Sequence, residues 1–167
     1  MNPITHPFDP IYSAHSEILI LGSFPSVQSR ARNFYYGHPQ NRFWRVLACV
    51  FSAVSLDAAD TAEVPVTVQE KYDMLMQNRL ALWDVLQSCT ITGSADVRIQ
   101  NAVPNDFSAL LQTCTLRRIL CNGGKAYELF RRYVTTEIPV YRMPSTSPAN
   151  AAWALEKLTE AWREGLL

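Results

Sequence analysis

Apolar residues are concentrated in four short runs spaced along the chain. Residues 18–21 read Ile-Leu-Ile-Leu and are followed by Gly22 and Pro25, the pattern of a strand that is covered on both faces and ended by a turn. Three further runs are also typical of strands, at residues 80–86, 118–121 and 139–143. The pattern therefore predicts four strands, of which the first is buried.

Between these runs, apolar residues recur at spacings of three and four, the period of an amphipathic helix. One predicted helix covers residues 41–52, with Asn41 at the position of its N-cap. A second covers residues 68–79 and begins with a capping box of Thr67 and Glu70. Three more helices are expected later in the chain. The first is capped by Asn105, the second follows Lys125, and the third is capped by Asn150.

The order of these elements predicts the fold class. Strands that alternate with helices form a mainly parallel sheet with helices on both faces, so we expect a three-layer α/β/α domain over residues 1–167. Three segments are expected to be irregular: an arm at residues 1–16 without assigned function, an acidic connection at residues 53–67, and a polar loop at residues 88–105.

The composition narrows the class of protein. A hydrophobic content of 48% indicates a globular chain, and no apolar run approaches the roughly 20 residues of a membrane span. The first residues lack the regions of a signal peptide, so we expect a soluble, intracellular, cytoplasmic protein. The four cysteines are far apart in sequence, which predicts buried free thiols and no metal or iron–sulfur site.

The formal net charge is zero, which argues against general electrostatic adhesion to nucleic acid. The charges are nevertheless unevenly distributed. Residues 23–45 contain four arginines and no acid, and residues 117–142 contain six basic residues against two glutamates. Arginine outnumbers lysine twelve to three, and its planar guanidinium suits phosphate oxygens. The basic segments fit phosphate binding, and they equally fit ordinary solvation of the surface.

The loop after the first predicted strand, residues 23–44, is the densest in residues typical of binding sites. It begins at the carboxyl end of a strand, which is where open α/β sheets bind ligands. Phe34, Tyr35 and Tyr36 stand there beside arginines and amides. This mixture suits stacking of a flat heterocycle together with phosphate binding. The alternative is that the aromatic residues form a lid packed on the core.

Several other features are candidates for chemistry. Residues 122–125, Asn-Gly-Gly-Lys, join a strand to a helix and form either an anion site or a close packing contact. Residues 144–148, Pro-Ser-Thr-Ser-Pro, offer hydroxyl groups to phosphates or a wedge for a groove. Asp84 has no second carboxylate beside it, so we favour a structural role. His6 and His15 are expected to be surface or capping residues.

Six motifs follow one another along the chain: Leu-Gly-Ser-Phe-Pro-Ser, Phe-Tyr-Tyr-Gly-His-Pro-Gln-Asn-Arg-Phe-Trp, Ala-Leu-Trp-Asp-Val-Leu, Val-Pro-Asn-Asp, Asn-Gly-Gly-Lys-Ala-Tyr and Pro-Ser-Thr-Ser-Pro-Ala-Asn. Over residues 18–162 the chain resembles the hypoxanthine-DNA (deoxyinosine) glycosylases of the uracil-DNA glycosylase superfamily. The resemblance implies a four-stranded parallel sheet between helices. It also implies a monofunctional, monomeric base-excision repair enzyme that acts on damaged duplex DNA without metal or cofactor.

The resemblance places the catalytic residue away from the first strand. In mismatch-specific uracil-DNA glycosylases the motif after the first strand reads Gly-Ile-Asn-Pro, and its asparagine positions the attacking water. This chain has Phe24 at the position of that asparagine. Ser23 does not replace it, because neighbouring strand-end residues point in different directions. The hypoxanthine-type relatives imply Asn41 instead, which would orient a water toward the sugar carbon. The competing role for Asn41 is that of helix cap, and both roles use the same side-chain oxygen.

The other expected site residues form two groups. The base-binding group comprises a stacking ring and hydrogen-bond donors to the departing base: Tyr36, the backbone of Gly22, Ser23 and Phe24, and the side chains of Asn105 and Asn122. The DNA-contacting group comprises basic, hydroxyl-bearing and proline residues of the loops: Pro25, Ser26, Arg42, Lys125, Ser145, Thr146, Ser147 and Pro148. Within this group, Ser145 and Ser147 are expected to hold phosphates. Thr146 and Pro148 are expected to fill the stack that the flipped base leaves.

Hypoxanthine is the expected base, with uracil and xanthine as open alternatives. Three other functions compete with this hypothesis. They are a mismatch-specific uracil or thymine glycosylase, a non-catalytic binder of damaged or single-stranded nucleic acid, and a nucleotide-binding protein that uses residues 122–125.

Overall fold

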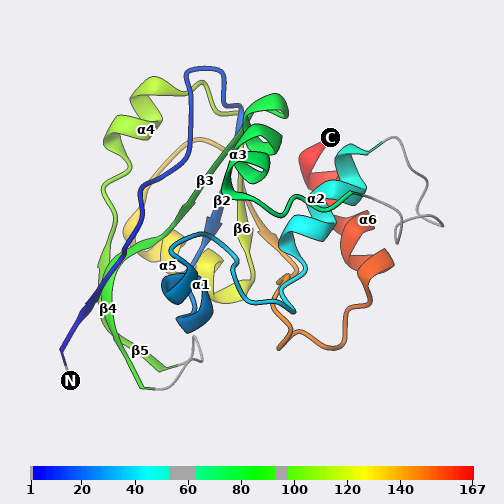
Figure 1. Ribbon diagram of the computed structural model, residues 1–167. Helices are drawn as coiled ribbons and strands as arrows, with labels where there is room; N and C mark the ends of the chain where they lie inside the picture. The colour runs from blue at the N-terminus through cyan, green and yellow to red at the C-terminus, as the bar shows by residue number, and fades with distance from the viewer. Residues whose placement is uncertain (1, 53–62, 93–97) are drawn as a thin grey trace.

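The computed structural model describes residues 2–52, 63–92 and 98–167 (Figure 1). Its helices and strands, in chain order, are β1 (Ile4–Thr5), β2 (Ile18–Gly22), α1 (Val27–Arg32), α2 (Phe43–Phe51), α3 (Val68–Gln77), β3 (Leu80–Asp84), β4 (Leu86–Ile91), β5 (Ile99–Pro104), α4 (Ser108–Thr113), β6 (Arg118–Asn122), α5 (Gly124–Tyr133), β7 (Val140–Met143) and α6 (Leu155–Leu166).

Four strands form a parallel sheet in the order β3-β2-β6-β7. They are the four apolar runs of the sequence, so the predicted strands are confirmed. The first of them, β2, is fully buried and pairs with a strand on each side. Its carboxyl end, Gly22, therefore lies in the middle of the sheet edge, beside Asp84 at the end of β3.

Each face of this sheet has its own hydrophobic core, because successive strand residues point to opposite faces. Ile18 and Ile20 of β2 join the core under α2, α3 and α6. Leu19 and Leu21 join the core under α4 and α5. Figure 1 shows the two sets of helices on opposite sides of the sheet. The predicted three-layer α/β/α fold is confirmed.

The structure corrects the prediction that residues 88–105 form a loop. Outside residues 93–97, which lie beyond the described part of the chain, this segment pairs as the antiparallel strands β4 and β5, with β1 on the other side of β4. An antiparallel sheet can leave one face in water, so its strands carry polar residues that resemble a loop in the sequence. Much of the acidic connection, residues 53–62, also lies outside the described residues.

Three predicted helix starts are shifted. Helix α2 begins at Phe43, so Arg42 is at its N-cap position, but the side chain that caps the first turn is that of Asn41, whose Oδ1 accepts the Phe43 N–H. Before α4, Asp106 Oδ1 accepts the Ser108 N–H at 2.9 Å, whereas Asn105 bonds to the end of β3. Helix α6 begins at Leu155 instead of after Asn150.

Other local predictions are confirmed. Thr67 and Glu70 form a complete capping box at the start of α3. All four cysteines are free and buried. Among the described helices, none is long and apolar enough to cross a membrane.

Residues 2–16 of the arm, to which the sequence analysis assigned no function, pack against the rest of the fold. Its β1 pairs with β4, and Ile11 forms a bridge with Leu82 of β3. The arm therefore runs across the edge of the main sheet and carries His6 to the end of β3.

Candidate active site

A cavity of about 860 Å³ opens at the carboxyl ends of the parallel strands. All four strands contribute to its wall, at Gly22 of β2, Asp84 of β3, Asn122 of β6 and Met143 of β7. The segments at residues 23–44 and 144–153 supply most of the rest, together with Ile91, Gly123 and Gly124. The site is therefore at the sheet edge where the sequence places it.

The motif at the end of β2 forms one wall of the cavity. Gly22, Ser23, Phe24 and Pro25 are all buried, and Ser26 stands at the exposed rim. The Phe24 ring belongs to the core under α4 and α5, so it supplies no hydrogen-bonding group. This burial explains how a phenylalanine is accommodated where mismatch-specific relatives carry an asparagine.

Position 22 requires a glycine because two side chains approach its backbone closely. A Cβ atom added to it would lie 2.3 Å from Asp84 Oδ1 and 3.2 Å from the Tyr36 hydroxyl. These two side chains therefore converge directly over the Gly22 backbone. Any larger residue would push the Asp84 carboxylate out of its place.

The three consecutive aromatic residues have different roles. Phe34 stacks near Trp44 at a centroid distance of 6.1 Å. Tyr35 is buried, and its hydroxyl donates to Asp9 O at 2.7 Å. Burial raises the pKa of Tyr35 well above its ordinary value, and the nearby Asp84 charge raises it further, so this residue is a neutral donor. The lid alternative is therefore correct for Phe34 and Tyr35.

Tyr36 lines the cavity together with Gly22 and Asn41, and it is more exposed there than its buried neighbour Tyr35, which also borders the cavity. Its ring stacks on Phe43 at a centroid distance of 4.0 Å and an interplanar angle of 26°. Its backbone has a φ of 54°, a left-handed conformation that is uncommon for a bulky residue. The stack on Phe43 fixes the ring in an orientation that the backbone alone would not favour.

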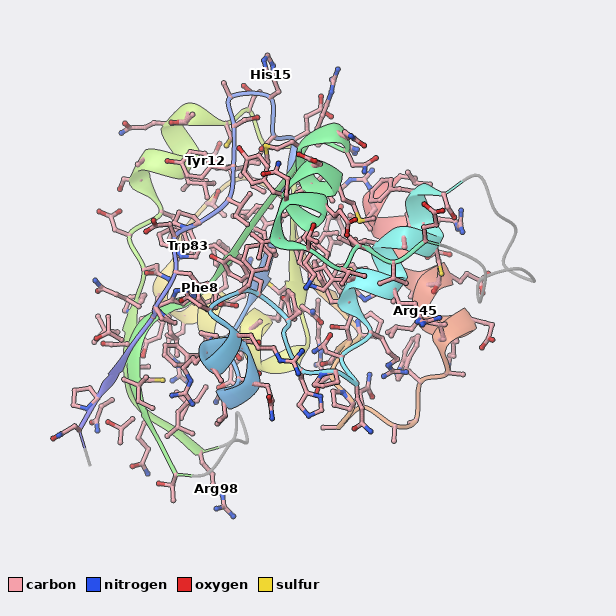
Figure 2. The ribbon with its side chains drawn as sticks, in the orientation of Figure 1. Phe8, Tyr12, His15, Arg45, Trp83 and Arg98 are labelled. Atoms are coloured by element: carbon pink, nitrogen blue, oxygen red, sulfur yellow. The ribbon has the colours of Figure 1, made fainter. Side chains whose placement is uncertain are left out.

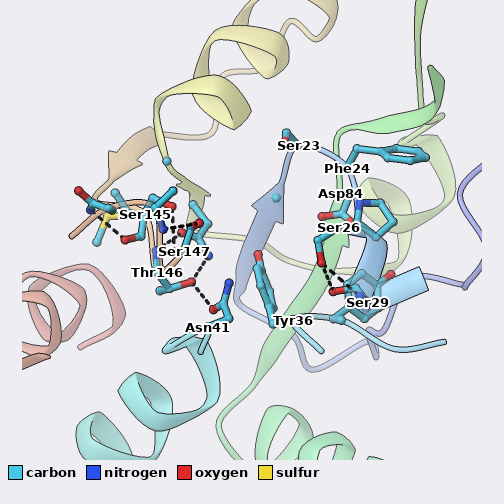
Figure 3. Close-up of a pocket in the computed structure, with 18 of the residues that line it drawn as sticks. Ser23, Phe24, Ser26, Ser29, Tyr36, Asn41, Asp84, Ser145, Thr146 and Ser147 are labelled. Atoms are coloured by element: carbon cyan, nitrogen blue, oxygen red, sulfur yellow. Dashed lines mark hydrogen bonds between the residues drawn. The ribbon is translucent and has the colours of Figure 1, made fainter. Parts of the chain in front are cut away.

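A chain of hydrogen bonds crosses the cavity floor from β6 to the start of α2 (Figure 3). Asn122 Nδ2 donates to Thr146 Oγ1 at 2.9 Å, and Thr146 Oγ1 donates to Asn41 Oδ1 at 2.9 Å. The backbone N–H of Thr146 also donates to Asn122 Oδ1 at 3.0 Å. Two asparagines from distant parts of the chain are thus held by one threonine.

The side-chain oxygen of Asn41 is fully used by the protein. It accepts from the Phe43 N–H at 2.9 Å and from the Thr146 hydroxyl, and an amide oxygen has two lone pairs. Figure 3 shows the amide nitrogen on the cavity side. The family resemblance predicts that this oxygen orients a water, but both of its lone pairs are occupied. The group that Asn41 offers to the cavity is therefore its amide N–H, a hydrogen-bond donor.

Arg42 holds the loop at residues 144–153 in place. Its guanidinium donates to the backbone oxygens of Ser147 and Asn150 at 3.2 and 3.1 Å, and also to that of Trp153. These three carbonyls use its donors, so the expected phosphate contact of Arg42 is replaced by a structural role. The arginine shapes the wall that carries Ser145 and Ser147.

Of the other residues expected to contact DNA, some line the cavity and others do not. Ser145 and Ser147 line the cavity and are partly exposed. Thr146 is fully buried, so the prediction that it enters the base stack is wrong: its side chain faces the two asparagines. Pro148 and Lys125 lie outside the cavity wall, and Lys125 Nζ is 3.8 Å from Glu128 Oε1.

Asn105 is not brought into the cavity. Its side chain donates to the Asp84 backbone oxygen at 2.9 Å and its N–H donates to Val85 O at 2.8 Å. It secures the kink between β3 and β4, so the prediction that it binds the base is wrong. The paired glycines at the start of α5, Gly123 and Gly124, serve close packing, since Cβ atoms there would meet Ser145 and Arg142.

Sequence reasoning missed four residues at the site. Asp84 lines the cavity and is bonded to His6, with 2.7 Å between His6 Nε2 and Asp84 Oδ2. Arg30 and Arg142 add positive charge to the wall. His6 and Asp84 are 78 positions apart in the chain, so no sequence signal indicates their pairing. Within the described ranges, no three His, Cys, Asp or Glu side chains are grouped to hold a metal ion.

Comparison with known proteins agrees with this architecture. The family model of the uracil DNA glycosylase superfamily matches residues 10–165. A hypoxanthine DNA glycosylase of Methanosarcina acetivorans is 36% identical over 156 residues, 92% of each chain, and one of Methanosarcina barkeri is 33% identical over 160 residues, 94% of each chain. A solution NMR structure of a candidate uracil DNA glycosylase from Methanosarcina acetivorans has a TM-score of 0.73 and 34% identity, covering 95% of this chain and 96% of that one. With a matching model, relatives over almost the whole length and a shared fold, the chain belongs to the uracil DNA glycosylase superfamily.

Proposed function

We propose that this DNA glycosylase removes hypoxanthine from duplex DNA by hydrolysing the N-glycosyl bond, and leaves an abasic site. Two relatives that align with nearly the whole chain are named hypoxanthine DNA glycosylases. The observation that carries the proposal is the cavity in which Tyr36 and Asn41 face the ends of β2 and β6. It combines an aromatic ring with fixed amide donors.

The substrate nucleotide must leave the helix, because a stacked base is out of reach of any side chain. Flipping costs a few kcal/mol, and the cost is smaller for a mispaired base. A volume of about 860 Å³ is ample for a purine nucleotide. Tyr36, fixed on Phe43, stacks on the flipped base or its sugar and repays part of this cost.

Bond cleavage leaves negative charge on the departing base, and donors that meet this charge lower the barrier. The amide of Asn41 is held with its nitrogen toward the cavity, so it donates a hydrogen bond to the base as the bond breaks. A single pre-oriented donor of this kind is typically worth roughly 100- to 1000-fold in rate. Asn122 has one amide hydrogen left after bonding Thr146 and supports the same charge.

The DNA backbone is held by the rim of the cavity. Ser26, Ser145 and Ser147 offer hydroxyls, and Arg30 and Arg142 supply the positive charge that phosphates require. The zero net charge of the whole chain predicts weak binding to undamaged DNA, since most non-specific affinity comes from charge. We propose that the enzyme acts as a monomer.

End-labelled oligonucleotides test this function. Hypoxanthine, uracil and xanthine are each placed in a single strand and opposite every normal base, incubated with the protein, and treated with hot alkali to cut abasic sites. We expect strand breaks at hypoxanthine in duplexes. Breaks only at uracil opposite guanine would identify a mismatch-specific enzyme, and binding without breaks in any substrate would identify a non-catalytic binder.

A further inference from the structure

A second cavity, of about 420 Å³, lies beside the candidate active site, and the chemistry proposed above does not use it. Tyr36 and Asn41 line both cavities, so the two lie on either side of the same short stretch of wall. The remaining residues of the second cavity come from the segments at residues 32–45 and 64–68 and from Lys71 of α3. The second cavity therefore continues the surface around the first.

Three cations from three helices meet in the second cavity. Arg32 ends α1, Arg45 lies in α2 (labelled in Figure 2), and Lys71 lies in α3. None of the described residues that line the cavity is acidic. In the described part of the chain, no carboxylate forms an ion pair with any of the three cations. The cavity thus carries positive charge that the described residues do not neutralise.

Aromatic rings hold Lys71 in this cavity. Its Nζ lies 5.4 Å from the centroid of the Trp44 ring and 5.8 Å from that of the Phe34 ring. Both rings attract a cation, so they fix the end of a side chain that is otherwise flexible. Burial lowers the pKa of Lys71 from its ordinary value, and the positive charge of Arg32 lowers it further. The ammonium is partly withdrawn from water near a like charge, an arrangement that a bound anion stabilises.

The rim of the second cavity is apolar. Pro39, Val66 and Val68 line it and are exposed, and Val66 has a relative exposure of 79%. Cations beside exposed apolar groups match a nucleotide unit of DNA, in which an anionic phosphate adjoins a largely apolar deoxyribose. A small free anion has no apolar part to occupy this rim. The combination therefore favours a DNA strand as the occupant.

We propose that the second cavity binds a backbone phosphodiester of the substrate DNA next to the flipped nucleotide, with Arg32, Arg45 and Lys71 as its cationic contacts. The inference rests on the proposed glycosylase function, because a nucleotide in the first cavity brings the adjoining strand to the wall that both cavities share. Phosphate contacts position a duplex and carry no information about the base. The second cavity therefore contributes affinity for every substrate alike.

Lys71→Gln tests this contact through the salt dependence of DNA binding. The probe is a duplex with a tetrahydrofuran abasic analogue, which has no base to release. We expect affinity to fall roughly 5- to 10-fold at about 0.1 M salt, and the slope of log Kd against log salt concentration to fall by about 0.9, the value for one phosphate. Arg131→Gln is the matched control, because Arg131 is exposed on α5 and lines neither cavity. An unchanged slope in Lys71→Gln, or an equal change in Arg131→Gln, would overturn the proposal.

Neutral phosphates in the DNA test the same contact from the other side. Methylphosphonate replaces one phosphate at a time on both sides of the abasic analogue. At one position we expect the replacement to weaken binding by the unmodified protein roughly 5- to 10-fold but to have little effect on Lys71→Gln. Arg32→Gln changes an exposed residue at the end of α1, so it takes the place of Lys71→Gln if that variant does not fold. Equal effects on unmodified and variant proteins at every position would contradict the contact.

Free ligands distinguish DNA from other sources of phosphate. Orthophosphate and deoxyadenosine monophosphate are added in thermal unfolding of the unmodified protein and of Lys71→Gln, and we expect no stabilisation that depends on Lys71. Stabilisation that Lys71→Gln abolishes, together with unchanged duplex affinity, would assign the cavity to a free phosphate compound and overturn the proposal. A protein that neither binds the abasic duplex nor releases any base would refute the proposed function itself. Normal base release and duplex binding, with an unchanged salt slope in Lys71→Gln, would refute this inference alone.

Discussion

The Thr146 hydroxyl donates to Asn41 Oδ1 at 2.9 Å, across a separation of 105 residues in the chain. This bond and the Phe43 N–H occupy the oxygen of Asn41 and turn its amide nitrogen to the cavity. The bond to the first turn of α2 and the donation to the base that we propose thus use opposite ends of one amide and do not compete. Figure 2 draws the side chains on the ribbon and labels Arg45, which belongs to α2, the helix that follows Asn41.

Asn41→Asp separates the two ends of this amide. Aspartate keeps an oxygen for Phe43 and Thr146 but has no amide hydrogen, so we expect base release to fall about 100-fold or more. The melting temperature should change little. Single-turnover release and thermal unfolding measure the two effects. Near-normal release by this variant would refute the donor role.

Asn41→Ala removes both ends at once. We expect the same loss of base release and, in addition, a fall of about 1 kcal/mol in the free energy of unfolding, the usual worth of a cap. Asp106→Ala is the matched control, because it removes the cap of α4 away from the cavity and should leave base release unchanged. Equal stability of the Asn41→Ala variant and the unmodified protein would contradict the capping contact.

Thr146→Val tests the bridge between the two asparagines. Valine has nearly the same shape but leaves Asn41 Oδ1 and Asn122 Nδ2 each without one partner. We expect the free energy of unfolding to fall by about 1–3 kcal/mol and base release to fall with it. Denaturant unfolding and single-turnover assays measure both. Thr146→Ser keeps the hydroxyl, so failure of serine to restore release would show that the hydroxyl is not the functional group.

Gly22→Ala tests the close approach at the strand end. The new Cβ would lie 2.3 Å from Asp84 Oδ1, so the carboxylate must move and its bond to His6 must lengthen. We expect loss of base release together with about 1–3 kcal/mol of stability. Gly165→Ala in α6 is the control, because its Cβ would meet the flexible end of Met143 and one methyl group of Leu120, both away from Asp84. Full activity of Gly22→Ala would show that the position of Asp84 is not constrained.

Cys121 gives a pH-dependent prediction. Burial raises the pKa of its thiol from 9.0 to about 12, so the folded state keeps the proton while the unfolded state loses it above pH 9. The unfolded state then binds fewer protons, and the free energy of unfolding falls as pH rises from about 9 to 12. Thermal unfolding measured across this pH range should show that stability declines less steeply with pH in Cys121→Ala than in the unmodified protein. Identical slopes would contradict the assignment.

The sequence by itself determined the central sheet and its helices. Apolar runs with a strand character had to be buried on both faces, and the chain order of strands and helices left a parallel sheet as the solution. The position of the site at the carboxyl ends followed from that topology. Asn41 and Tyr36 could be named as candidates because each stands within a short, recognisable motif, and both line the cavity.

Only the tertiary structure decided which atoms act. The direction of the Asn41 amide depends on Thr146, the capture of Asp84 depends on His6, and the role of Arg42 depends on three carbonyls of a distant loop. These contacts join residues 78 to 111 positions apart. Side-chain hydrogen bonds over such separations leave no periodic pattern in a sequence, because one distance and one angle at the folded site determine each of them.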